Sequence, residues 1–296
     1  MVKTFGDLTV VKQYADQFRR LRGERTTPPD LSIIIPVNAQ GDLETVFGPL
    51  SDIVGYNGRY QLEIILVINN YPEAAEPPEI ETFRQMGLCV VGVPSARRSG
   101  EVVIISARAL GVMAAAAEAT AHFDADCRIG NIDALVDWYV RSLRSNYQLA
   151  YSHVGYYELR PMASVYVKIG IHHLSRWVKR VLFQIPVTRG SNYAIEKLLF
   201  LQLYRAGKLS VDLQVGPAAK LAGAKIIFSR QRRYHVYTSG RRFKGGWDKL
   251  LGYFRYRLRY NLKATPRRRK DVRRTSWEGF DQESERRKTF TEKDAV

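Results

Sequence analysis

The stretch Ala121 to Ile129 reads AHFDADCRI and places two aspartates, Asp124 and Asp126, directly after a short apolar run. Residues two apart in a strand project to the same face, so a strand that ends here directs both carboxylates into one site. Two carboxylates this close repel each other unless a cation lies between them. Mg²⁺ and Mn²⁺ take oxygen ligands, and Mg²⁺ binds through one or two carboxylates together with substrate phosphates. The stretch therefore predicts a cation site of the kind that binds a diphosphate.

A pair of aspartates one residue apart also arises by chance, so its context decides how it is interpreted. A helix-favouring run, Ser106 to Ala119, precedes the pair, and a second helical pattern, Asn131 to Leu143, follows it. The order helix, strand, acidic pair, helix predicts an α/β layout. In such layouts the carboxyl ends of the strands form the edge at which open sheets bind their ligands.

The text before the acidic pair predicts the start of a parallel sheet. Leu31 to Val37 and Leu62 to Ile68 are continuous apolar runs, which are typical of strands buried on both faces. A weaker strand is expected at Leu88 to Val93, after a Pro-rich loop that reaches Pro78. Helical spacing separates these strands, at Leu43 to Val54 and Ile104 to Ala119. Alternating strands and helices imply right-handed crossovers and a mostly parallel sheet.

The second half of the chain is expected to continue the sheet with longer helices. The predicted strands and helices, in chain order, are Gln148 to Val154 (strand), Met162 to Gln184 (helix), Ile195 to Arg205 (helix), Val215 to Leu221 (helix) and Ala224 to Phe228 (strand). The segment Met162 to Gln184 is amphipathic and basic. That pattern fits either a helix that covers the sheet or one that lies on a membrane.

The two ends differ from the middle. Val10 to Leu21 reads as a charged amphipathic lead-in without chemistry of its own, closed by Pro28 and Pro29. Trp247 to Leu262 is helical in pattern and interleaves aromatic residues with arginines, and the polar residues 263–296 are expected to be a disordered tail.

Composition limits the partners and the compartment. The 296 residues carry a formal net charge of +17, so the partners are anionic: nucleotide phosphates, an anionic membrane surface or nucleic acid. Cys89 and Cys127 form no CxxC pair and are expected to be reduced core residues, which argues against zinc. No run of 18 uncharged apolar residues and no signal segment occurs in the sequence, which predicts a cytoplasmic protein without a membrane-spanning helix.

Five segments in order make the chain resemble the family 2 glycosyltransferases of the GT-A fold, from Leu31 to Lys244. They are LSIIIPVNAQGDLE, LEIILVINN, ISARALGVMAAAAEATAHFDADCRI, TRGSNYAI and VDLQVGPAAKLAGAKI. The resemblance implies a Rossmann-like, mostly parallel sheet flanked by helices. It also implies a UDP- or GDP-sugar donor, a hydroxyl acceptor, Mn²⁺ or Mg²⁺, and inversion at the anomeric carbon. Residues 31–145 would bind the nucleotide sugar and residues 146–244 the acceptor; residues 1–30, 245–262 and 263–296 would be the lead-in, a basic amphipathic helix and the tail.

The resemblance also implies donor contacts. Pro36, Val37 and Asn38 would line the nucleoside pocket, and Asn69 would approach the base or ribose. Arg108 stands where a basic residue often neighbours the donor. The family's second strand commonly ends in an aspartate, and here the position is an asparagine, which both donates and accepts hydrogen bonds. Binding survives this change, but the base that is bound is left open.

The acidic residues receive their roles from the same resemblance. Asp126 would ligate the metal, and Asp124 would contact the ribose or the metal, with Ala125 beside the donor. Asp212 would be the base that takes the proton of the acceptor hydroxyl. The family usually has an acidic dipeptide there, and Val211 replaces its first member. Asp212 also precedes helical text, so a simple helix N-cap is the alternative interpretation.

Three later residues complete the donor side. Some GT-A enzymes take a third metal ligand from a late histidine, which corresponds to His235; a lone histidine is more often structural. Arg241 and Arg242 would clamp the diphosphate as forked donors, or belong to a solvated basic loop.

On the acceptor side, Gly190, Ser191 and Asn192 would lie near the acceptor hydroxyl or simply form a tight turn. The basic C-terminal helix suggests peripheral attachment to the inner face of a membrane and a lipid-linked or cell-envelope acceptor. Two other classes stay open. A nucleic-acid binder would use the aromatic residues and arginines near the C-terminus, and a nucleotidyltransferase would need a Gly-rich phosphate loop that PVNAQGD does not resemble.

Overall fold

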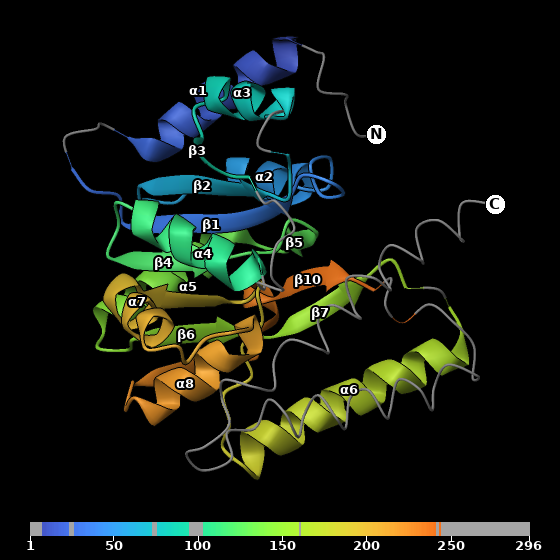
Figure 1. Ribbon diagram of the computed structural model, residues 1–296. Helices are drawn as coiled ribbons and strands as arrows, with labels where there is room; N and C mark the ends of the chain where they lie inside the picture. Colours follow the sequence, from blue (N-terminus) through green and yellow to red (C-terminus); the bar gives the residue numbers. More distant parts are fainter. Residues whose placement is uncertain are drawn as a thin grey trace.

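The computed structural model describes residues 8–23, 27–72, 76–94, 103–159, 161–240 and 243. A sheet of seven strands in the order β3-β2-β1-β4-β8-β6-β9 forms its centre (Figure 1). Its strands are β1 (Leu31–Asn38), β2 (Leu62–Asn69), β3 (Cys89–Val93), β4 (Ala119–His122), β6 (Leu149–Ser152), β8 (Tyr193–Glu196) and β9 (Ile226–Ser229). All pairs are parallel except those of β8, which runs antiparallel to β4 and β6. The expected mostly parallel α/β sheet is confirmed.

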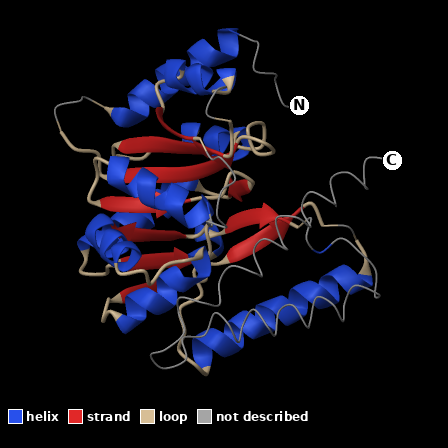
Figure 2. Ribbon diagram, viewed as in Figure 1, coloured by secondary structure: helices blue, strands red, loops and turns tan. Residues whose placement is uncertain are grey.

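Helices cover both faces of this sheet (Figure 2). They are α1 (Leu8–Arg22), α2 (Phe47–Val54), α3 (Pro78–Gln85), α4 (Val103–Ala114), α5 (Ile132–Arg144), α6 (Ala163–Val181), α7 (Lys197–Arg205) and α8 (Val215–Leu221). The side chain of Asn131 accepts a hydrogen bond from the Ala134 amide at 2.9 Å and caps α5, as its sequence signals. The apolar sides of these helices, except that of α6, enclose two cores, one on each face of the sheet.

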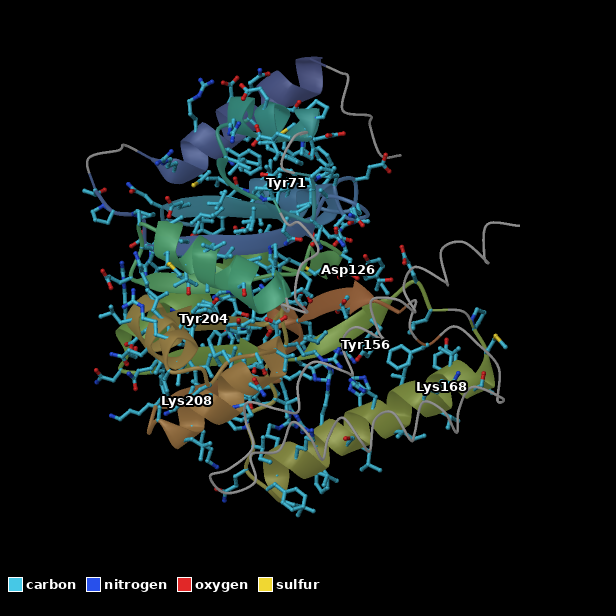
Figure 3. All side chains as sticks on the ribbon, viewed as in Figure 1. Tyr71, Asp126, Tyr156, Lys168, Tyr204 and Lys208 are labelled. Atoms are coloured by element: carbon cyan, nitrogen blue, oxygen red, sulfur yellow. The ribbon has the colours of Figure 1, made fainter. Side chains whose placement is uncertain are left out.

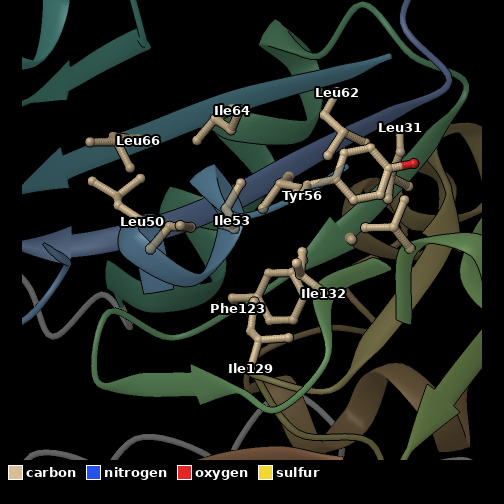
Figure 4. Close-up of a cluster of buried hydrophobic side chains, with 14 of the residues drawn as sticks. Leu31, Leu50, Ile53, Tyr56, Leu62, Ile64, Leu66, Phe123, Ile129 and Ile132 are labelled. Atoms are coloured by element: carbon tan, nitrogen blue, oxygen red, sulfur yellow. The ribbon is translucent and has the colours of Figure 1, made fainter. Parts of the chain in front are cut away.

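The two cores follow from the alternation of side chains along β1. Ile33 and Ile35 point into the core under α1, α2, α3 and α5, part of which Figure 4 shows. Ile34 points into the other core, under α4, α7 and α8. Every residue of β1 up to Val37 is buried, and so is all of β2. The continuous apolar runs in the sequence are therefore explained by burial on both faces.

A second, three-stranded sheet stands beside the first. It consists of β5 (Cys127–Ile129), β10 (Val236–Ser239) and β7 (Val154–Tyr157), in the order β5-β10-β7. The single strand expected at Gln148 to Val154 is wrong, because it is two strands in different sheets. The backbone changes partners at His153, whose carbonyl accepts from the Val236 amide at 3.3 Å, while the Ser152 amide still donates within the large sheet to the Asn192 carbonyl at 2.9 Å.

Other expected boundaries also need correction. Ile195 does not begin a helix but lies in β8, since it is held between β4 and β6, and helix α7 starts only at Lys197. Helix α4 ends at Ala114, five residues before the expected end at Ala119, which already begins β4. In both places the pairing of strands overrides the helix-favouring local sequence.

Two further elements were not expected at all. Pro78 is not the end of a loop, because it begins α3, where its missing amide costs no hydrogen bond. The basic stretch from Ser229 to Lys244 contains strand β10. The expected helix at Leu43 to Val54 is helical only from Phe47, after a series of turns.

Candidate active site

One buried arginine joins the acidic pair to the candidate base. The guanidinium of Arg108, on α4, is fully buried; its Nε donates to Asp212 Oδ1 at 2.8 Å and its Nη2 donates to Asp124 Oδ1 at 2.5 Å. Its third nitrogen donates to the Phe123 carbonyl at 3.4 Å. We call Arg108, Asp124 and Asp212 the arginine bridge. It connects three elements that are separated by up to 104 positions in the sequence.

The fold places each member of the arginine bridge at one edge of the sheet. Asp124 follows β4, at the carboxyl end of that strand, and Arg108 reaches it from α4, which packs on β1 and β2. Asp212 begins a single 3-10 turn, Asp212–Gln214, that leads directly into α8. The N-cap of that turn is Val211, whose amide donates to the Gln214 side-chain oxygen at 3.3 Å, and the Asp212 carboxylate accepts from Arg108 instead. The N-cap interpretation therefore does not account for this side chain.

Burial sets the electrostatics of the arginine bridge. Burial raises the pKa of the Asp212 carboxyl, the nearby Arg108 cation lowers it, and the negative charge of Asp124 raises it again, with a net rise above its ordinary value. Burial opposes the charge of Arg108, but Asp212 and Asp124 outweigh it and raise the pKa of the guanidinium. Arg108 therefore stays cationic, while the Asp212 carboxylate holds a proton more readily than an ordinary aspartate. A carboxylate of that kind suits a general base.

Gly190 allows a loop to lie directly against the arginine bridge. A Cβ atom at this position would stand 2.7 Å from Asp212 Oδ2 and would also collide with Asp124 Oδ1 and Arg108 Nη2. Thr188 fixes the same loop, since its hydroxyl donates to the Asp212 carbonyl at 3.3 Å and accepts from the Gly216 amide at 2.9 Å. The segment expected near the acceptor therefore lies beside the candidate base.

The two residues that follow Gly190, Ser191 and Asn192, are buried within the same loop. The Asn192 side-chain oxygen accepts from the Arg189 amide at 2.8 Å, and its nitrogen donates to the Ser152 carbonyl. Ser191 is 1% exposed, and its hydroxyl finds no partner within the described residues. Asn192 thus has a structural task that ties the loop to β6. Ser191, in contrast, keeps a buried hydroxyl that no described residue binds.

Asp126 lies at the turn that leads into β5 (Figure 3). Thr238, on β10, donates its hydroxyl to Asp126 Oδ1 at 3.3 Å, and Tyr157, on β7, donates to the Asp126 carbonyl at 2.8 Å. Ala125, between the two aspartates, is buried. The sequence did not indicate Thr238 and Tyr157 as neighbours of Asp126, because the pairing of β10 with β5 and β7 has no local signal.

The residues expected at the nucleoside pocket lie at the same edge of the sheet. Asn38 and Asn69 are register partners at the carboxyl ends of β1 and β2. The Asn38 side-chain oxygen accepts from the Gln40 amide at 3.0 Å, and the Asn69 carbonyl accepts from the Ala39 amide at 2.9 Å. Pro36 and Val37 precede them in β1 and are buried. The fold thus brings this set together next to the acidic pair.

The structure does not bring His235 to the acidic pair. Strand β10 pairs with β5 so that Thr238 faces Cys127, whereas the His235 carbonyl accepts from the Gly130 amide at the far end of the pairing. The His235 ring packs on His153 at 4.8 Å between centroids, and its Nε2 contacts the Arg230 carbonyl at 3.0 Å. In the part of the chain that the structure describes, no group of three His, Cys, Asp or Glu residues could hold a metal ion.

The remaining carboxylates still fit a cation that is shared with a ligand. Asp124 is 36% exposed, and Asp126 is also partly exposed, so both carboxylates can be reached from outside. One or two carboxylates are the protein's usual share of a Mg²⁺ site, and substrate phosphates supply further oxygens. Arg241 and Arg242, expected at the diphosphate, lie outside the described residues, as do the Trp247 to Leu262 helix and the tail.

Comparison with solved structures shows which known fold the chain shares. Neither a family model nor a curated protein matches the sequence. A mannosyltransferase of Pyrobaculum calidifontis, PcManGT, solved with GDP-Man and Mn²⁺, aligns with a TM-score of 0.50 and 16% identity, over 86% of this chain and 70% of that one. This chain shares the fold of that glycosyltransferase. TarS of S. aureus aligns with a TM-score of 0.48 and 14% identity, over 79% of this chain and 39% of TarS.

Replacing Gly190 by alanine tests how closely the loop must lie against the arginine bridge. Since the added methyl group meets three charged atoms, we expect Gly190→Ala to lower the free energy of unfolding by about 1 to 3 kcal/mol, the usual effect of overpacking. Urea unfolding measures this. Gly41→Ala is the matched control, because a Cβ there meets nothing within 4 Å. Equal stability of both variants would contradict the close approach.

Stability against pH tests the state of Asp212. Its folded pKa is raised, so the stability linked to this group is complete below the unfolded pKa of about 3.9 and is lost as pH rises through the folded value. We therefore expect the stability of the parent relative to Asp212→Asn to rise as pH falls from 7 to 4, while loss of the carboxylate that faces Arg108 lowers the stability of the variant at both pH values. Urea unfolding at the two pH values measures this difference, and a relative stability that stays constant or falls between pH 7 and pH 4 would contradict the raised pKa.

Removing the cation of Arg108 should lower the stability of the protein. Arg108→Met leaves Asp124 and Asp212, which are 36% and 17% exposed, facing each other without the cation, and we expect a loss toward the lower end of the range of about 3 to 5 kcal/mol that breaking a buried ion pair from one side costs. The matched control is Arg141→Met, which removes an exposed ion pair with Asp137 on α5 and should cost no more than about 1 kcal/mol. Thermal unfolding compares the two variants. Similar losses would show that the arginine bridge is not a buried one.

Proposed function

We propose that this protein is a glycosyltransferase that moves a sugar from a UDP- or GDP-sugar to an acceptor hydroxyl. The observation that carries the proposal is the arginine bridge, which joins the candidate base Asp212 to the acidic pair at the ligand-binding edge of the sheet. The shared fold with a glycosyltransferase supports it. Residues 31–145 would bind the donor and residues 146–244 the acceptor, in keeping with family 2 and with inversion at the anomeric carbon.

The acceptor side of the reaction would depend on Asp212. Its Oδ1 is held by Arg108, whereas within the described residues no group donates to its Oδ2, the oxygen nearest Gly190. An acceptor hydroxyl beside Gly190 would give its proton to Asp212 as its oxygen attacks the anomeric carbon and the bond to the diphosphate breaks. The raised pKa of Asp212 brings the carboxylate closer to the strength that proton transfer near neutral pH requires.

The donor side would use fixed positive charge and the acidic pair. Arg108 supplies a buried cation beside Asp124, and a buried charge acts more strongly than one in water. Asp126 and Asp124 would hold Mn²⁺ or Mg²⁺, which when bound neutralises charge on the departing diphosphate. Asn38 and Asn69 would hydrogen-bond the nucleoside from adjacent strand ends, and Ser191 would meet the acceptor. His235 has no part in this proposal, because it precedes β10, at the opposite end of that strand from Thr238.

Donor binding and transfer can be tested with one pair of variants. A nucleoside diphosphate that binds the folded protein at about 100 times its Kd stabilises it by about 2.7 kcal/mol. We expect UDP or GDP with Mn²⁺ to raise the melting temperature of the parent, and Asp126→Ala to lose this response and about 1000-fold or more of the transfer rate. The control Asp137→Ala changes an aspartate on α5 that is as exposed as Asp124 and lies outside the candidate site. It should behave like the parent.

Two outcomes would contradict the proposal. If no nucleoside diphosphate shifts the melting temperature with or without Mn²⁺, the protein has no site for the proposed donor. If Asp126→Ala transfers sugar at the parental rate, the cation role of Asp126 is lost, although Asp212 can still be examined separately.

A further inference from the structure

Helix α6 buries its polar face and exposes its apolar face, the reverse of an ordinary surface helix. The residues that it buries are mostly polar: Ser164, Val165, Lys168, His172 and Arg176. Its large apolar residues are exposed instead. In a surface helix of a globular protein the apolar stripe faces the core and the charged residues face water. Here the helical period found in the sequence is present, but its two faces are exchanged.

The polar face of α6 is held by the body of the protein. Arg176 donates to the Val154 carbonyl at 3.0 Å and to the Tyr156 hydroxyl at 3.3 Å, both on β7. One turn earlier, His172 contacts Arg189, which belongs to the loop beside the candidate base. Burial of cations without such contacts would be costly, so these bonds fix which face of the helix points inward. The outward orientation of the apolar face follows from them.

The outer face of α6 is a continuous apolar stripe. Val167, Leu174, Trp177 and Val181 recur every three to seven residues, so they share one side of the helix, and they are 40%, 59%, 40% and 48% exposed. The stripe is extended at both ends by Met162, Tyr166, Leu182 and Phe183, which are 42%, 57%, 65% and 64% exposed. Contiguous exposed apolar patches of this kind mark interaction surfaces in proteins.

The surroundings of the stripe indicate its partner. No aspartate or glutamate occurs between Glu158 and Glu196, while the same interval contains Lys179 and Arg180 at the end of α6. Tyr and Trp prefer the boundary between lipid and water, where one part of the ring is wet. Among the described residues no helix is long and apolar enough to span a bilayer. Cations, interfacial aromatics and a one-sided apolar stripe are the features of a helix that lies in the plane of an anionic membrane.

We propose that the outer face of α6 binds an anionic lipid surface, with the helix parallel to it and the stripe inserted among the acyl chains. This binding does not require the transfer reaction. Where the proposed transfer also holds, the contact of His172 with Arg189 ties the acceptor loop to the inner face of the helix that lies on the lipid, and the acceptor is then a membrane-borne hydroxyl compound; this last step rests on the proposed function.

Vesicle binding by the full chain tests the proposal. We expect the protein to co-sediment with vesicles of phosphatidylglycerol and phosphatidylcholine, to bind pure phosphatidylcholine less, and to be released by salt. Leu174→Glu should lower the partition coefficient by about tenfold, because it places a charge in the middle of the apolar stripe. Leu198→Glu is the matched control. It makes the same change at an exposed leucine of α7 (64% exposed) and should bind as the parent does.

Each alternative occupant of the stripe gives a result that overturns the proposal. If the chain's own residues 244–296 cover it, Leu174→Glu lowers the melting temperature and leaves vesicle binding unchanged. If a second copy covers it, the same substitution lowers the molar mass in sedimentation equilibrium without changing vesicle binding. Equal partition of the parent, Leu174→Glu and Leu198→Glu also contradicts it. Because no nucleotide is present, none of these results depends on the donor or on the base.

Discussion

The site depends on one buried cation that is shared by two carboxylates. The Arg108 side chain is fully enclosed, and the cost of removing its charge from water is offset only because Asp124 and Asp212 meet it from different parts of the chain. The same contacts fix how the 3-10 turn before α8 sits against the end of β4. Gly190 completes the arrangement, since any side chain at that position would occupy the space of the charged groups. Fold and candidate chemistry therefore rest on the same three side chains.

In the proposed reaction, the two carboxylates that Arg108 joins would have different tasks. Asp124 follows β4 at the edge where Asn38 and Asn69 end their strands, and both Asp124 and Asp212 reach the loop that contains Gly190. A buried carboxylate whose pKa is raised is unfavourable for stability but suited to accepting a proton, which is the compromise expected of a functional group. The outward-facing apolar side of α6 is a second departure from the pattern of a stable monomer. In both places the sequence gives up stability where a ligand or a surface would restore it.

The sequence predicted the parts of the fold that are decided locally. Apolar runs identified β1 and β2, and the acidic pair was expected, correctly, at the carboxyl end of a strand. The predictions from sequence were wrong where the pairing of distant segments decides the local structure. The break at His153 and strand β10 in a basic stretch depend on hydrogen bonds to distant segments, which leave no local pattern. Periodicity showed that α6 is amphipathic but not which face is buried, because that follows from the contacts of Arg176 with β7.

Nucleoside diphosphate affinity in calorimetric titrations tests the central claim most directly, because it separates the two sides of the arginine bridge. The account predicts that Asp124→Asn and Asp126→Asn lose the Mn²⁺-dependent part of the affinity, since both carboxylates serve the donor. It predicts that Asp212→Asn binds the nucleoside diphosphate as the parent does while transferring no sugar, since Asp212 serves the acceptor. Loss of nucleotide binding in Asp212→Asn, together with unchanged binding in the two acidic-pair variants, would contradict this division.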